Sequence, residues 1–366
     1  MIMKKIDAIL DKAYNEQILS EAEVKFLLDL RDKKEISALF LTARDLRQRY
    51  FGKKLFLYGF VYFSTYCRNE CVFCYYRASN SAGRRYRITV AQAVESACGL
   101  ADSGVHLIDL TMGEDSFFLK CESGLKKFET LVTQVKSNTN LPIMISPGLL
   151  PEEYLTVLSG AGADWYACYQ ETHNRELFSR LRPGQDYDRR FLAKQHAKKI
   201  GLLIEEGILT GVGESGNDIA MSMNNMHDIG AQQVRVMSFN PQKGTPMSGW
   251  FSPDRLQELQ IIAVMRLIFP EKLIPASLDI DGVKNLKKRL DAGANVITSF
   301  IPPFSGLSGV SQIDLDINEG NRTVDGVLRV IDESGLEIAR ASEYLQWIGT
   351  EKKKAGKKND VCETVV

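Results

Sequence analysis

The chain has 366 residues, of which 44% are hydrophobic and 25% are charged, a composition typical of a globular enzyme with a sizeable core. Lys and Arg together number 46, as do Asp and Glu, so no overall charge favours nucleic acid or an anionic membrane surface. No apolar run approaches the roughly 20 residues that span a bilayer, and residues 1–10 lack a signal-peptide pattern. We therefore expect a cytoplasmic protein that acts on a small molecule.

The predicted elements begin with helices in residues 1–50 and continue with short apolar runs that alternate with helical segments. A glycine precedes many of these runs, as in loops that lead from a helix into a strand. Eight runs are candidate strands: 55–63, 107–113, 142–148, 165–171, 203–213, 234–241, 273–280 and 295–303. Signals of helix starts are the capping-box pairs Ser20–Glu23 and Thr89–Gln92, Pro151, and Ser252 with Pro253.

Eight parallel strands that alternate with helices over about 250 residues predict a (β/α)8 barrel, here assigned to residues 51–310. The alternative is a doubly wound sheet, which would normally have fewer strands. We expect the helices of residues 1–50 to flank the barrel, and residues 311–350 to form a helical extension. Residues 351–366 carry a run of lysines and are predicted to be a frayed, solvated tail.

Three cysteines, Cys67, Cys71 and Cys74, follow directly after the first predicted strand, where the active-site loops of barrels emerge. Clustered thiols of this kind suit a reducing compartment and metal binding. Three thiolates at this spacing can hold three irons of a [4Fe-4S] cluster and leave the fourth iron open to an external ligand. A structural zinc is the alternative, but zinc requires four protein ligands, and no fourth Cys or His lies nearby in the sequence.

The segment CRNECVFC, residues 67–74, matches the CxxxCxΦC motif (Φ, aromatic) of radical S-adenosylmethionine enzymes. With DLTMGED, YQET, LRPGQDYD and PASLD, it resembles the biotin-synthase-like group, and within it the lysine mutases of pyrrolysine biosynthesis, over about residues 40–310. The resemblance implies a [4Fe-4S] cluster, S-adenosyl-L-methionine, a 5′-deoxyadenosyl radical and an unidentified electron donor. It also implies that lysine is the substrate and 3-methylornithine the product.

Two other functions remain open from the sequence. One is another biotin-synthase-like enzyme, such as a hydrogenase-cofactor maturase or biotin synthase. Biotin synthase would need further cysteines inside the barrel for its second cluster, and only Cys168 qualifies. The other is a non-catalytic iron–sulfur or zinc scaffold that binds RNA through Lys352 to Lys358. Cleavage of S-adenosylmethionine after anaerobic reconstitution would separate an enzyme from a scaffold.

Four residues near predicted strand ends are candidates to bind S-adenosyl-L-methionine. Glu171 ends the fourth strand and can accept hydrogen bonds from the ribose or the ammonium, and Arg190 can pair bidentately with the carboxylate. The resemblance gives both residues these roles and places Glu114 at the methionyl amino group; Ser146, near the end of the third strand, is grouped with them. Alternatively, Glu171 caps a loop and Arg190 is a surface arginine.

Four further residues are predicted to point into the barrel, because alternate residues of a barrel strand face its interior. Asp109, Arg235, Ser277 and Asp279 have apolar neighbours that face the helices. One cation, two carboxylates and a hydroxyl would complement a diamino acid, and the resemblance implies that lysine is the ligand. The alternative is an internal salt-bridge network that closes the barrel without a ligand.

Overall fold

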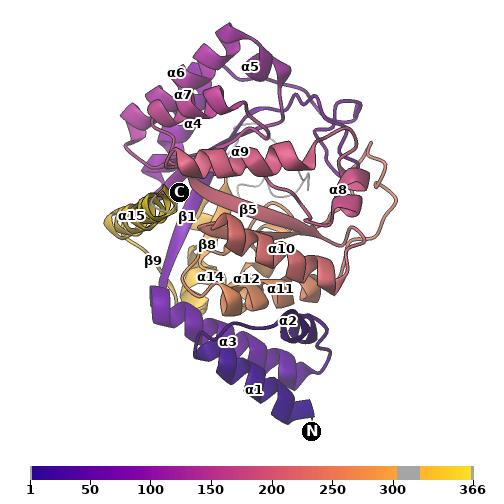
Figure 1. The fold of residues 1–366 in the computed structure, drawn as a ribbon. Coiled ribbons are helices and arrows are strands. Elements are labelled where there is room, and N and C mark those ends of the chain that lie inside the picture. Colours follow the sequence, from indigo (N-terminus) through magenta and orange to yellow (C-terminus); the bar gives the residue numbers. More distant parts are fainter. Residues whose placement is uncertain (1, 303–321, 364–366) are drawn as a thin grey trace.

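The computed structural model describes residues 2–302 and 322–363 (Figure 1). Eight parallel strands hydrogen-bond in the order β6-β5-β4-β3-β2-β1-β8-β7, and a parallel bridge between Gln233 and Leu273 joins β6 to β7. The predicted (β/α)8 barrel is therefore confirmed, with a strand in each predicted run. The strands are β1 (Lys54–Ser64), β2 (Leu107–Met112), β3 (Ile143–Ser146), β4 (Trp165–Ala167), β5 (Leu203–Thr210), β6 (Gln233–Ser238), β7 (Pro275–Ser277) and β8 (Val296–Phe300).

Helices surround the barrel and extend it at both ends of the chain (Figure 1). The N-terminal helices α1 (Ile2–Tyr14), α2 (Glu21–Leu28) and α3 (Lys33–Phe51) pack against α11 on one flank. The barrel helices are α4 (Val90–Asp102), α5 (Ser116–Lys120), α6 (Glu122–Thr139), α7 (Glu152–Gly160), α8 (Arg175–Leu181), α9 (Tyr187–Lys199), α10 (Gly216–Ile229), α11 (Arg255–Ile268), η1 (Gly282–Asn285) and α12 (Leu286–Asp291). After them come α14 (Val324–Glu333), β9 (Glu337–Ile338) and α15 (Ala341–Glu363).

Both predicted capping boxes are present, at the starts of α2 and α4. The start of α11 differs from the prediction, because Asp254, not Ser252, is its N-cap and accepts a hydrogen bond from the Leu256 N–H at 3.0 Å. Pro253 instead packs so closely on Gly211 that a side chain at that glycine would collide with it. Tertiary packing thus moves the helix start by two residues.

Strand β4 is shorter than predicted and ends at Ala167. Glu171 takes a left-handed conformation with φ of 67° and pairs again with β5, because its N–H donates to the Gly207 carbonyl at 3.1 Å. Between these two points the Gln170 N–H donates to the side chain of Glu206 at 2.9 Å. A buried carboxylate thus replaces a backbone acceptor where the strand leaves the sheet.

Helix α15 covers the N-terminal end of the barrel. Its Tyr344 is buried, and its hydroxyl lies 2.6 Å from that of Tyr58 on β1, while Trp347 stacks on Trp165 of β4 with ring centroids 5.9 Å apart. The helix continues to Glu363, so the expected frayed tail from residue 351 is wrong over this stretch. Part of the reason is tertiary, since Lys352 pairs with Asp164 at 2.6 Å.

The N-terminal and C-terminal ends of the barrel have different contents. Aromatic and aliphatic side chains from strand starts fill the floor beside α15, whereas the strand ends lead into an open region that carries the cysteine loop. Residues 311–321 of the expected extension lie outside the described residues. No helix of the described chain has the length and apolar character needed to cross a membrane.

Candidate functional site

A cavity of about 220 Å³ opens at the C-terminal end of the barrel. Side chains of every strand from β1 to β7, or of the loop that follows it, contribute to its wall. All eleven candidate residues chosen from the sequence line this cavity: Cys67, Cys71, Cys74, Asp109, Glu114, Ser146, Glu171, Arg190, Arg235, Ser277 and Asp279. The chain therefore brings the cysteine triplet and the polar barrel residues into one site.

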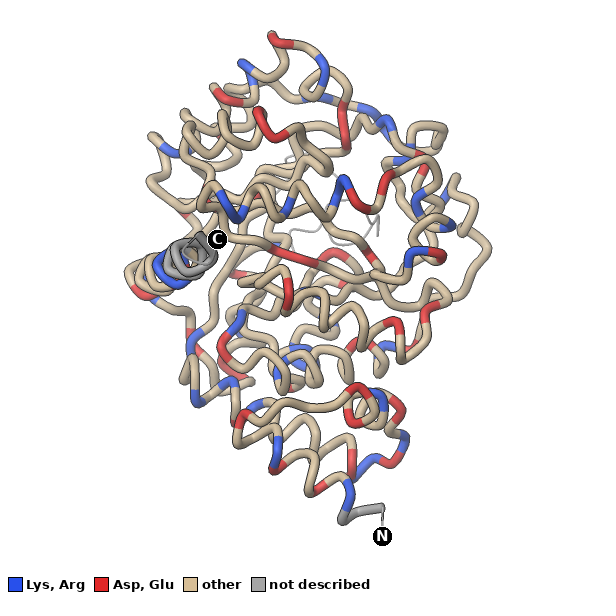
Figure 2. Tube along the Cα trace, in the orientation of Figure 1, with Lys and Arg blue, Asp and Glu red and all other residues tan. Residues whose placement is uncertain are grey.

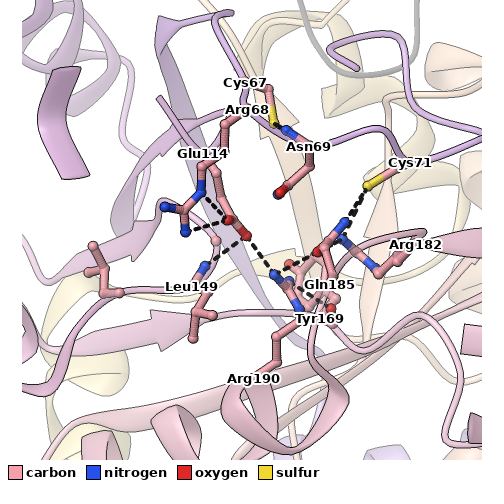
Figure 3. A network of polar contacts seen from close by, with 12 residues as sticks. Cys67, Arg68, Asn69, Cys71, Glu114, Leu149, Tyr169, Arg182, Gln185 and Arg190 are labelled. Carbon is pink, nitrogen blue, oxygen red and sulfur yellow. Dashed lines mark hydrogen bonds and ion pairs between the residues drawn. The ribbon is translucent and has the colours of Figure 1, made fainter. Parts of the chain in front are cut away.

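The cysteine loop is held by backbone hydrogen bonds to two neighbouring segments: the Arg68 N–H donates to the Glu114 carbonyl, just beyond β2, at 3.0 Å, and the Val72 N–H donates to the Leu181 carbonyl, at the end of α8, at 3.0 Å. Donors also point at its sulfurs (Figure 3). The Gln185 side chain donates to Cys71 Sγ at 3.0 Å, and the Arg182 guanidinium donates to the same sulfur at 3.5 Å. Such donors stabilise negative charge on sulfur.

The chemistry of the thiols fits an iron–sulfur cluster. Burial raises the pKa of Cys67 to about 11, and burial with the neighbouring thiols raises the pKa of Cys74 further, so anionic sulfurs here need a compensating cation. Within the described ranges, no three His, Cys, Asp or Glu side chains converge as one metal ion would require. A cubane differs from such a site, because each cysteine binds its own iron.

Glu114 follows β2 and is the centre of a charged network beside the cysteines (Figure 3). Its carboxylate accepts hydrogen bonds from Arg190 at 2.6 Å, from Arg68 at 3.1 Å and from the Leu149 N–H at 3.0 Å. Burial opposes ionisation, but Arg190 and the Leu149 N–H outweigh it and lower the pKa of Glu114. Arg190 is thus buried and paired, which excludes the surface role that the sequence left open.

Glu171, which follows β4, is held by Arg182, a residue that the sequence analysis did not select. Arg182 donates to Oε1 at 2.6 Å, while Oε2 is buried without a hydrogen-bond partner. Burial raises the pKa of Glu171 in spite of the nearby Arg182 and Arg190. A buried carboxylate oxygen without a donor, on a residue in strained left-handed conformation, is typical of a ligand site.

Asp109 and Arg235 lie deeper, inside the barrel. Asp109 accepts a hydrogen bond from Ser146 at 2.7 Å, and burial raises its pKa to about 8. Arg235 donates through Nε to Glu205 at 2.6 Å and through Nη1 to Thr298 at 3.1 Å, while Nη2 is buried without a partner. One guanidinium donor therefore remains for a ligand carboxylate.

Asp279 has more partners than the sequence suggested. Its Oδ1 accepts from Tyr62 at 2.9 Å and from Arg322 at 2.7 Å, and its Oδ2 accepts from Ser299 at 2.9 Å. Ser277 lies beside it, with its hydroxyl 3.4 Å from Oδ2. The internal salt-bridge alternative is thus partly correct, because Arg235 and Asp279 each have a partner from the protein.

Those two partners, Glu205 and Arg322, were missed in the sequence analysis. The sequence held a signal for Glu205, because Glu205 and Glu206 are adjacent on one strand and must face opposite sides of the barrel wall. Arg322 gave no such signal, since it lies beyond the last barrel strand.

Comparison with known proteins agrees with this geometry. Residues 61–225 match the family described as "Radical SAM superfamily". The chain is 41% identical to 3-methylornithine synthase of Methanosarcina barkeri over 95% of its length and 99% of the relative's. The crystal structure of methylornithine synthase (PylB) superposes with a TM-score of 0.88 at 42% identity, covering 93% of this chain and 99% of that one. The [FeFe] hydrogenase maturase subunit HydE of Thermotoga maritima is 27% identical over 81% of this chain and 82% of its own.

A closed parallel barrel with a cysteine triplet after its first strand defines a radical S-adenosylmethionine enzyme, and the match over residues 61–225 agrees. Within this superfamily, identity and coverage are higher with the synthases than with the maturase. The chain belongs to the 3-methylornithine synthase family.

Proposed function

We propose that the chain converts lysine into 3-methylornithine by a radical rearrangement of the carbon skeleton. The observation that carries this proposal is the single cavity that joins the three cysteines to a charged barrel interior. Membership of the chain in the 3-methylornithine synthase family supports the same reaction. Biotin synthase has less support, because the described barrel wall offers one further cysteine, Cys168, for its second cluster. A maturase has less support because the chain is 27% identical to the maturase subunit HydE and 41% identical to the synthase.

In this proposal Cys67, Cys71 and Cys74 hold the [4Fe-4S] cluster, and an external protein of unknown identity supplies the electron. Together with S-adenosylmethionine, the bound cluster supplies a carbon radical that abstracts hydrogen. Gln185 and Arg182 donate to the Cys71 sulfur and so stabilise its negative charge. Such outer contacts tune the reduction potential of a cluster.

The cofactor's polar groups have partners among the strand-end residues. Glu114 accepts hydrogen bonds from the methionyl ammonium group. Arg190, already fixed by Glu114 and the Tyr169 carbonyl, binds the methionyl carboxylate. Glu171 offers its unpaired Oε2 to the ribose hydroxyls. Ser146 lies between the two halves of the site, and its hydrogen bond to Asp109 ties the cofactor wall to the substrate wall.

The barrel interior holds and orients lysine. The free Nη2 of Arg235 binds the substrate carboxylate, Asp109 ionises to bind an ammonium, and Ser277 with Asp279 completes the polar wall. Helix α15 covers the floor through Tyr344 and excludes water from that side. Exclusion of water protects a reactive fragment until it rejoins the carbon skeleton.

The proposal is tested with anaerobically reconstituted enzyme, reductant and lysine deuterated along its side chain. A rearranged product has the mass of the substrate, and deuterium appears in 5′-deoxyadenosine or in recovered S-adenosylmethionine. Cys74→Ala should lose most of its iron and all cofactor cleavage, whereas Cys121→Ala, which changes an exposed cysteine, should behave as wild type. Cleavage at the same rate without lysine, with no isobaric product, would rule out lysine as the substrate.

A further inference from the structure

The charged side chains of the barrel interior form two ion pairs and leave one carboxylate over. Among the described residues, Arg235 pairs with Glu205 at 2.6 Å and Arg322 pairs with Asp279 at 2.7 Å. Asp109 accepts from the neutral Ser146. When all three acids are ionised, these five groups carry a net charge of minus one.

Arg322 is the unexpected member of this set, because it comes from the chain that precedes α14 and not from a barrel strand. Its side chain is 1% exposed. Its Nε and Nη2 donate to the Ser299 carbonyl at 2.9 and 2.7 Å, and Nη2 also donates to Asp279. The guanidinium is thus fixed in the barrel wall at the carboxylate.

The backbone conformation of Ser299 supports this contact. Its φ of 74° lies in the left-handed region that residues other than glycine rarely occupy, and such strain persists only where surrounding contacts maintain it. In this conformation the Ser299 carbonyl faces Arg322 while its hydroxyl donates to Asp279 at 2.9 Å. Backbone strain and side-chain contacts therefore serve the same arrangement, in which Asp279 is neutralised.

A ligand enclosed among these groups must balance their charge, because an uncompensated charge in a buried site is strongly unfavourable. Lysine carries one carboxylate and two ammonium groups near neutral pH and has a net charge of plus one. Its charge equals and opposes that of the barrel interior when Arg322 is in place. Without Arg322 the interior would carry minus two.

We propose that Arg322 determines substrate specificity by setting the net charge of the barrel interior to match a diamino acid of net charge plus one. This inference rests on the proposed use of lysine. Arg322 acts through Asp279 and is therefore a positioning residue. Its effect is to select ligands by total charge, beyond the individual hydrogen bonds that they form.

The test compares the binding of three ligands to the reconstituted enzyme by calorimetry, without reductant. Lysine has a charge of plus one, lysinamide of plus two, and 6-hydroxynorleucine, in which a hydroxyl replaces the side-chain ammonium, of zero. Arg322→Gln should lower the preference for lysine over lysinamide about tenfold or more, while Arg322→Lys keeps it. Arg329→Gln, the same change at a side chain that is 89% exposed, is the matched control and should bind as wild type.

A double variant distinguishes charge selection from a structural role. Asp279→Asn with Arg322→Gln restores the net charge of minus one. It should restore the preference for lysine over lysinamide, even if the affinities for both ligands fall. The inference is wrong if Arg322→Gln weakens lysine and lysinamide equally, or if the double variant keeps the altered preference. If Arg322→Gln fails to fold, Asp279→Asn alone, which raises the net charge of the interior from minus one to zero, should shift the preference from lysine towards 6-hydroxynorleucine, and an unchanged preference would then overturn the inference. If wild type binds no lysine, the proposed function itself fails.

Discussion

Asp109 shows how a single residue can couple substrate binding to a proton. It is 1% exposed, and its pKa is raised to about 8, chiefly by burial and in part by Glu205 and Asp279, against the lowering effects of Ser146 and Arg235. In the empty site near neutral pH the carboxyl group is therefore largely protonated. An ammonium ion binds its ionised form, so binding must displace the proton.

We therefore predict that lysine binding strengthens as pH rises. Below the pKa of Asp109, each pH unit should raise the affinity up to about tenfold, since one proton is released per lysine bound, and the affinity should level off above about pH 8. Calorimetry in buffers of different ionisation enthalpy would count this proton. Asp109→Asn should abolish the pH dependence, and an affinity for wild type that is constant from about pH 6 to 8 would contradict the prediction.

At the scale of elements, β4 and β5 depend on a buried ion pair behind the barrel wall. Lys194 of α9 pairs with Glu206 of β5, and both side chains are inaccessible to solvent. Glu206 also accepts from the Gln170 and Gly207 N–H groups, each at 2.9 Å. It thereby fixes the bend that carries Glu171 into the cavity.

Lys194→Met should destabilise the fold by about 3–5 kcal/mol, because it leaves a buried carboxylate without its cation. Combining it with Glu206→Gln should recover part of the loss, since the amide oxygen can still accept from the two backbone groups. The free energy of unfolding in urea measures both. Arg175→Gln breaks an exposed pair with Asp188 and should leave the free energy of unfolding unchanged. If Lys194→Met and Arg175→Gln lowered it equally, the structural role of the buried pair would be contradicted.

Helix α15 makes a second prediction at this scale. Tyr344→Ala removes a buried aromatic side chain from the barrel floor and should lower stability by about 3–5 kcal/mol. Tyr344→Phe should lower it by about 1 kcal/mol, through the lost contact with the Tyr58 hydroxyl. Thermal or urea unfolding distinguishes these from Leu345→Ala, at an exposed neighbour, which should match wild type. If Tyr344→Ala left the stability unchanged, α15 would not be the element that closes the barrel floor.

Over the whole molecule, positive and negative side chains are interspersed along the chain (Figure 2). The lysines of α15 that suggested an RNA-binding tail include Lys352 and Lys354, which pair with Asp164 and with Glu271 and Glu351. Ion pairs of this kind neutralise the potential that would attract a polyanion.

The protein should therefore show no measurable affinity for single-stranded RNA near physiological salt. Fluorescence anisotropy with a labelled oligonucleotide would measure it, with Lys352→Glu and Lys354→Glu as charge-reversed controls. If wild type bound the oligonucleotide and both variants did not, the alternative of an RNA-binding scaffold would be supported again.

The sequence predicted the barrel well because alternating strand residues and glycine-terminated helices are local patterns. The same alternation placed Asp109, Arg235 and Ser277 correctly in the cavity. It could not predict that Arg322 would neutralise Asp279 or that Glu206 would end β4 early, because those contacts join distant segments. Helical continuation of α15 past residue 350 was missed for the same reason, since partners such as Asp164 and Glu271 lie elsewhere in the chain.

A barrel covered at one end by α15 is filled and emptied through the other. Asp109, Arg235 and Ser277 lie within the strands, whereas Glu114 and Glu171 lie beyond strand ends, nearer the opening. In the proposed enzyme the amino acid must then enter before the cofactor, and the product can leave only after the cofactor has left. The cofactor is then the last ligand to bind and the first to leave, so its departure controls product release.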